Sequence, residues 1–149
     1  MQQRLNTKDR LARLQVVESA DTGCPLCMLD RESVNHVFLY YIMGRKIWYT
    51  ISEWLGIIWV MSGSIEKHAY AWFGFTGIGL RRELWLTAFF AIIGAIWEYK
   101  NKVVFDNYKM CDRWLLLLIK VRISSWIKAN RHEFPYRILE VVHNVEAFL

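Results

Sequence analysis

Proline is scarce in this 149-residue sequence, with only Pro25 and Pro135 present. Because proline removes a backbone donor and clashes with the preceding helical turn, the long interval between these two residues can form helices without interruption. No segment alternates apolar and polar residues for long enough to indicate a half-buried strand. The sequence therefore predicts an all-α fold, a small helical bundle.

Cysteine is also scarce, and the three residues are Cys24, Cys27 and Cys111. An odd number, with no signal-peptide pattern after Met1, argues against a disulfide framework and favours a reducing intracellular compartment, the nucleus or the cytoplasm. A Cys-x-x-Cys pair in such a compartment indicates a metal or redox site. The redox interpretation is weaker, because a thioredoxin-type pair expects a strand–helix setting. We expect Cys111 to be a small buried residue.

No hydrophobic run is long enough for a membrane span. The longest candidate, Leu84–Trp97, contains fourteen residues, whereas a helix needs about 20 apolar residues to cross a bilayer. This run is therefore predicted to be a buried core helix, and we do not expect the chain to enter a membrane.

Aromatic residues, by contrast, are abundant. The chain is 54% hydrophobic and 15% aromatic, with eight tryptophans, a composition that excludes intrinsic disorder. A bundle of this size is not expected to hide every ring, so some aromatic surface should remain available to a protein partner. The net charge of +5 favours nucleic acid or an anionic membrane surface without distinguishing them.

Apolar residues recur at helical spacing along most of the chain. We predict one domain, 1–149, with a zinc-knuckle-like half over residues 5–57 and a long-helix half over residues 80–149. A short first helix, capped by Asn6 or Thr7, should bury Leu11 and Leu14, and Ser64 should cap another short helix. Further helices are predicted over Glu32–Tyr40, Gly44–Leu55, Leu80–Phe105, Asp112–Asn130 (capped by Asp112) and Tyr136–Phe148.

The residues most informative about function begin at Cys24. Two thiolates on a tight Cys-x-x-Cys turn can share a tetrahedral zinc ion. Eight residues separate Cys27 from His36, and four more separate His36 from Tyr41. With cysteine in place of Tyr41, this row would be Cys-x2-Cys-x8-His-x4-Cys, a complete four-ligand set. The spacing predicts Cys24, Cys27 and His36 as metal ligands.

Several blocks of sequence surround these residues: RLNTKDRLARL, CPLC, ESVNHVFLYY, RKIWYTISEWLG and LWLTAFFAIIGAIWEYKNKVVF. In this order they resemble the zinc-binding domain that follows the reverse transcriptase in plant LINE-type non-LTR retrotransposons. The family commonly has LPTKDRLAR, CPLC, ESVDHLFLHC, WxxxxxWLG and a (K/R)N..(V/I)F signature, which Lys100, Asn101, Val104 and Phe105 match. The resemblance covers about Leu5 to Phe105.

This resemblance implies a non-catalytic helical module that once assisted a reverse transcriptase in handling its RNA or target DNA. It also implies zinc at Cys24, Cys27 and His36. Two departures stand out: Tyr41 occupies the position of the fourth ligand, and the helix that normally precedes the LPTKDRL block is missing. We therefore expect an N-terminally truncated member with impaired zinc binding, because a phenol is a poor zinc ligand at neutral pH.

Other groups could complete the metal site. Cys111, His68, Asp30 and Glu32 are candidates for the fourth ligand, and water is another. Three zinc ligands and a water also occur in catalytic zinc sites, but no positioned base is evident. The chain likewise lacks a phosphate-binding glycine loop and the paired aspartates of a polymerase or RNase H. We expect no enzymatic activity.

Basic residues form a second candidate site. At about 100° per residue, Arg113, Lys120 and Lys128 fall on one stripe of a helix, followed by Arg131. Such a stripe could contact RNA or DNA phosphates without reading sequence. The favoured alternative is a solvated helix face opposite a buried core formed by Trp114–Ile119. For the whole chain, the alternative functions are a metal-free helical interaction or membrane-associated scaffold, and a non-functional remnant of a dead element.

Overall fold

The computed structural model describes residues 5–18, 22–108, 111–131 and 133–148. Within these ranges the structure is helical, apart from an isolated antiparallel bridge between Gly23 and Arg31. The predictions of an all-α fold and of a Cys-x-x-Cys turn near the N-terminus are confirmed. The elements are α1 (Lys8–Arg13), the π-helix η2 (His36–Tyr40), α2 (Ile42–Trp54), α3 (Ile65–Phe73), α4 (Gly79–Asp106), α5 (Asp112–Asn130), α6 (Ile138–His143) and the 3-10 helix η3 (Val145–Phe148).

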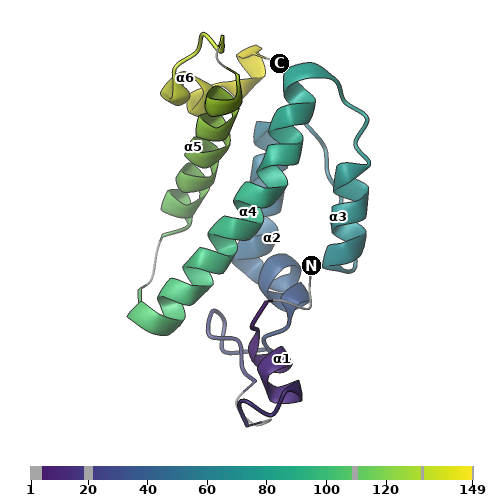
Figure 1. Cartoon of the computed structure of the whole chain (residues 1–149), viewed down its shortest axis with the longest axis vertical. Coiled ribbons are helices and arrows are strands. Elements are labelled where there is room, and N and C mark those ends of the chain that lie inside the picture. The colour runs from purple at the N-terminus through teal and green to yellow at the C-terminus, as the bar shows by residue number, and fades with distance from the viewer. Residues whose placement is uncertain (1–4, 19–21, 109–110, 132, 149) are drawn as a thin grey trace.

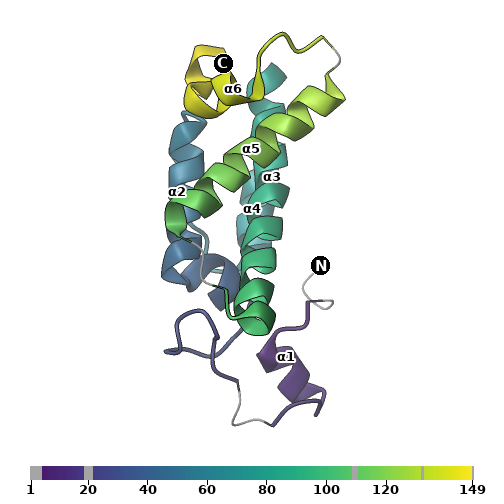
Figure 2. The ribbon, with the colours of Figure 1, turned by 90° about the vertical axis from the view of Figure 1, so that its left-hand side faces the viewer.

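The long helix α4 is the central element of the bundle. Helices α2, α3 and α5 all contact it, and α6 packs against α5. Figures 1 and 2 show α1 and the adjoining loop near one end of α4, and α6 near the other end. The bundle thus has two distinct ends, and the cysteine-bearing loop lies beside α1 at one of them.

Local sequence signals explain most helix boundaries. Ser64 caps α3 as predicted, and its Oγ accepts a hydrogen bond from the Lys67 amide at 3.3 Å. Helix α4 ends at Asn107, which adopts a left-handed conformation with φ of 50°, a common way to end a helix. The cap of α5 differs from the prediction, since it is Cys111 and Asp112 lies inside the first turn. There the carboxylate still faces the positive end of the helix dipole.

Tryptophan pairing forms the centre of the core. The indole rings of Trp72 and Trp85 stack with centroids 3.5 Å apart and planes 6° apart. Each indole N–H donates to the backbone carbonyl of the other residue, at 2.8 and 2.9 Å. Both side chains are fully buried, as is Trp48. This reciprocal pairing allows large rings with a polar N–H to be buried without losing a hydrogen bond.

Three predictions about burial were wrong. Helix α1 buries none of its residues, and Leu14 beyond it is 58% exposed, because the helix lies at the edge of the bundle. Cys111 is exposed rather than buried. Trp114, expected within the apolar face of α5, is 65% exposed, because the buried stripe of that helix runs through Leu115 and Ile119 and Trp114 lies beside it.

Leu84–Trp97 lies within α4 and supplies much of its buried face. Among the residues that the structure describes, no helix combines the length and the apolar character needed to cross a bilayer.

Candidate metal centre

The loop that carries the two cysteines is closed by backbone hydrogen bonds. The Cys24 amide donates to the Asp30 carbonyl at 2.7 Å, and the Met28 amide donates to the Cys24 carbonyl at 2.9 Å. Met28 has φ of 60°, which turns the chain sharply after Cys27. The loop therefore holds both cysteine side chains in place through the backbone.

Backbone N–H groups also point at the sulfur atoms. The Leu29 amide donates to Cys27 Sγ at 3.5 Å, and the amides of Leu26 and Cys27 donate to the Cys24 sulfur. Burial raises the pKa of the Cys24 thiol, while the hydrogen bonds from these amides oppose that rise. Hydrogen-bond donors directed at sulfur favour the thiolate, the form that binds metal.

His36 comes from the first position of η2, where the Tyr41 amide donates to the His36 carbonyl at 2.7 Å. In an α-helix, five residues rotate by about 500°, so positions 36 and 41 would point to nearly opposite sides. The wider π turn places the side chains of His36 and Tyr41 more nearly on the same side of the helix. Gly44 permits this turn, because a Cβ there would lie only 3.2 Å from the carbonyl oxygens of Val37 and Phe38.

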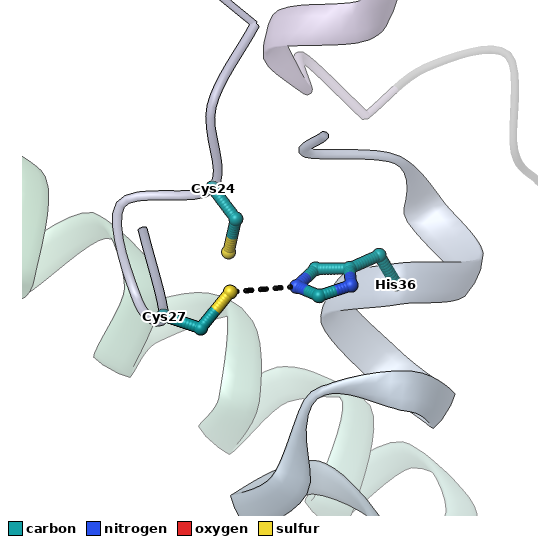
Figure 3. A group of neighbouring side chains, drawn as sticks. All are labelled: Cys24, Cys27 and His36. Carbon is teal, nitrogen blue, oxygen red and sulfur yellow. Dashed lines mark hydrogen bonds between the residues drawn. The ribbon is translucent and has the colours of Figure 1, made fainter. Parts of the chain in front are cut away.

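The predicted ligands meet in space. One ligand atom from each of Cys24, Cys27 and His36 lies within 4.8 Å of the others. Figure 3 shows the two sulfur atoms and the imidazole pointing toward one another, with Cys27 Sγ 3.3 Å from His36 Nε2. Sulfur and nitrogen ligands of a tetrahedral zinc ion lie roughly 3.5 Å apart, given metal distances of about 2.3 and 2.0 Å. These residues are close enough to hold a metal ion, and their donor chemistry fits zinc.

Tyr41 is next to this group. Its ring centroid lies 6.5 Å from that of His36. Burial raises the pKa of the Tyr41 phenol to about 12, and the negative charges of nearby groups, Cys24 and Cys27 among them, add to the shift. The raised pKa keeps the phenol protonated at neutral pH, and a protonated phenol is a poor zinc ligand.

The other candidate ligands do not join this group. His68 is fully buried among aromatic rings, T-shaped against Trp48 at 4.5 Å between centroids. Asp30 lies beside the metal group, but its Oδ2 is 3.7 Å from His36 Nδ1, the ring nitrogen that does not face Cys27. Among the described residues, no fourth His, Cys, Asp or Glu joins the group.

Glu32 has a different role, which its position in the sequence did not predict. Its carboxylate is fully buried and lies 3.0 Å from Lys100 Nζ, itself only 7% exposed. Glu32 Oε1 also accepts a hydrogen bond from the Lys8 amide at 3.1 Å. Lys100 lies on the buried stripe of α4, after Ile92 and Ile96. A charged residue on such a stripe indicates that an oppositely charged side chain is buried beside it. The pair links the cysteine loop, α1 and α4.

The basic stripe is only partly available for ligands. Arg131 forms two hydrogen bonds with Glu83, at 2.7 and 2.5 Å, and Lys120 lies over the Trp54 ring at 5.2 Å. Burial lowers the pKa of Lys120. Lys128 is exposed and donates to the Tyr136 carbonyl at 3.4 Å. Arg113 is exposed. The four residues therefore do not form one uniform cationic surface.

Comparison with protein-family models, with curated proteins and with solved structures found no match to this chain.

Proposed function

We propose that this chain is a retrotransposon-derived reverse-transcriptase zinc-binding domain without catalytic activity of its own. Its metal centre would consist of Cys24, Cys27 and His36, and zinc is the metal that the donor set favours. The observation that carries the proposal is the convergence of two thiols and one imidazole within 4.8 Å. The proposed retrotransposon ancestry is supported by a different observation, the ordered sequence blocks.

The role of this centre would be structural. A metal ion held by Cys24 and Cys27 on the loop and by His36 on η2 would tie two segments together at one end of the bundle. The buried Glu32–Lys100 pair, with Glu32 five residues beyond Cys27, joins the same loop to α4. The domain would then present its exposed surface to nucleic acid or to the reverse transcriptase, the contacts that the resemblance implies.

Metal content provides the first test. Dialysed against excess zinc under reducing conditions, the protein is expected to take up about one zinc per chain but to hold it more weakly than a four-ligand site would. Cys27→Ser or His36→Ala should lose most of this zinc, because the two remaining ligands hold the ion too weakly. Elemental analysis after equilibrium dialysis against zinc measures this directly.

Cys111→Ser is the matched control, since Cys111 is exposed and outside the group, and it should retain the wild-type zinc content. Tyr41→Cys should bind zinc more tightly than the wild type. If neither the wild type nor Tyr41→Cys binds zinc while both melt cooperatively, the ligand assignment is wrong.

Nucleic-acid contact gives a second prediction. Because Arg131 is paired with Glu83 and Lys120 is packed against the Trp54 ring, the exposed residues Arg113 and Lys128 are the ones expected to contact phosphates. The double variant Arg113→Gln, Lys128→Gln should reduce the slope of log Kobs against log salt for duplex DNA by about 1.8, at about 0.9 per phosphate. Fluorescence anisotropy across a salt series measures this slope.

The comparison variant is Lys120→Gln with Arg131→Gln, which carries the same charge change and should alter the slope much less. An equal decrease of the slope in both double variants would mean that DNA binding depends on the net charge of the chain and not on Arg113 and Lys128.

A further inference from the structure

The metal centre provides three protein ligands, whereas structural zinc sites are almost always four-coordinate. The first question is whether another side chain could move in. Glu32 is held by Lys100 in the interior, and withdrawing it would leave both charges buried without partners, which is costly. His68 is enclosed by the aromatic core, so neither residue can reach the site without disrupting the fold.

Asp30 and Cys111 are excluded by position. Asp30 lies against Nδ1 of His36, while Nε2 is the nitrogen that faces Cys27. Its carboxylate is therefore placed to accept a hydrogen bond from Nδ1 once the imidazole is fixed, as carboxylates beside metal-bound histidines do. Cys111 is exposed and caps α5. Of the described residues, this leaves only Tyr41 beside the fourth coordination position, and the alternative is a group from outside them.

Tyr41 lies beside this group, but a phenol is not a usual zinc ligand. The π turn of η2 brings its ring next to that of His36, with the centroids 6.5 Å apart. Its side chain and that of Cys27 are both only partly buried, so this part of the site can be reached from solvent. A ligand from outside the chain can therefore approach the three donors on the side where Tyr41 and Cys27 lie.

We propose that the metal held by Cys24, Cys27 and His36 completes its coordination with an exogenous thiolate. The inference rests on the proposed metal centre. Two thiolates and an imidazole already select a soft or borderline metal, for which sulfur is the preferred further ligand. An incoming thiol binds through its sulfur and releases its proton to solvent. The source is either a small-molecule thiol or a cysteine side chain of a partner protein, which share this chemistry.

The test uses cobalt(II) as a spectroscopic probe of the full chain, kept reduced with a phosphine so that no other thiol is present. Cobalt is titrated into the protein, and the thiolate-to-cobalt charge-transfer absorption is recorded before and after addition of N-acetylcysteine. The absorption is expected to rise saturably by about half, in proportion to an increase from two bound thiolates to three. Cobalt should also bind more tightly with the thiol present.

Two variants serve as controls. Tyr41→Cys is expected to give the three-thiolate absorption without added thiol and to respond little to it. Tyr40→Cys introduces a thiol one residue earlier in the chain. The Tyr40 hydroxyl donates to the Gly63 carbonyl at 2.5 Å, away from the site, so this variant should behave like the wild type.

A cysteine-containing tripeptide replaces N-acetylcysteine in a parallel titration. Tighter binding of the tripeptide indicates a protein cysteine as the source, and equal binding indicates a small thiol.

The outcomes separate the two proposals. If the wild type binds cobalt but the added thiol changes neither absorption nor affinity, the exogenous ligand is water and this inference is overturned, while the metal centre stands. The inference is also overturned if Tyr41→Cys binds cobalt while the wild type does not bind it, either with or without added thiol. If no variant binds cobalt, the metal centre itself is wrong. A wild type that binds cobalt only with thiol present supports both proposals.

Discussion

Replacing Lys100 with methionine is expected to lower the free energy of unfolding by about 3–5 kcal/mol. The Glu32 carboxylate is fully buried, and the ammonium of Lys100, 3.0 Å away, is the cation that compensates it. Methionine fills a similar volume but leaves the Glu32 carboxylate as an uncompensated charge in the interior. One oxygen of that carboxylate, Oε2, already has no hydrogen-bond partner among the described residues. Urea denaturation at neutral pH, followed by tryptophan fluorescence, measures the change.

Lys46→Met is the matched control, because Lys46 also pairs with a carboxylate, Asp112 Oδ2 at 3.1 Å, but both side chains are about half exposed. Exposed pairs contribute at most about 1 kcal/mol, so the control should have nearly the stability of the wild type. Adding Glu32→Gln to Lys100→Met should recover part of the loss, since the neutral amide no longer needs a counter-ion. Equal effects of the two lysine substitutions would contradict the buried pair.

Acid is expected to destabilise the fold through His68. Its side chain is fully buried, and neither ring nitrogen has a hydrogen-bond partner among the described residues. Burial lowers the pKa of His68 from 6.5 to about 4. Between these values the unfolded chain binds more protons than the folded one, so stability is complete above pH 6.5 and is lost as the pH falls toward 4. The loss at pH 4 amounts to about 3 kcal/mol, at about 1.4 kcal/mol per pKa unit.

Urea denaturation of the wild type and of His68→Phe at several pH values between about 4 and 7 tests this. Phenylalanine cannot be protonated, so the difference between the two proteins should widen as the pH falls, while shared effects of other groups cancel. Because the substitution removes two unpaired polar atoms, the variant should also be at least as stable at neutral pH. His143→Phe, at an exposed position, should follow the wild type. A constant difference across the series would show that His68 does not titrate on unfolding.

The helices could be predicted because their signals are local. The apolar period of Leu80–Phe105 indicated a helix within a residue of α4 at each end, and Ser64 marked the start of α3. Burial at the ends of elements was harder. Trp114 continues the apolar series of α5 and is nevertheless mostly exposed, because the bundle covers the face that carries Leu115 and Ile119. Which face of a helix is covered depends on the distant segments that pack against it.

The three side chains that converge near the N-terminus could also be identified from their spacing, but their geometry depended on two features that the spacing did not reveal. The segment Glu32–Tyr40 was predicted as an ordinary helix, and its ordered turn is instead the π-helix His36–Tyr40. The basis for this lies partly in Gly44, which allows α2 to begin close against the carbonyls of the π turn. A helical pattern alone does not distinguish a turn closed at four residues from one closed at five.

By itself, the sequence determined the helical class, most helix boundaries and the identity of the three donors, because helix periodicity, caps and ligand spacing are properties of neighbouring residues. The tertiary structure decided which polar groups are buried and with whom: Glu32 against Lys100 sixty-eight positions along the chain, His68 among tryptophans, and Lys120 and Arg131 against partners of their own. Burial and ion pairing depend on contacts between residues distant in sequence, and those contacts exist only once the helices have packed.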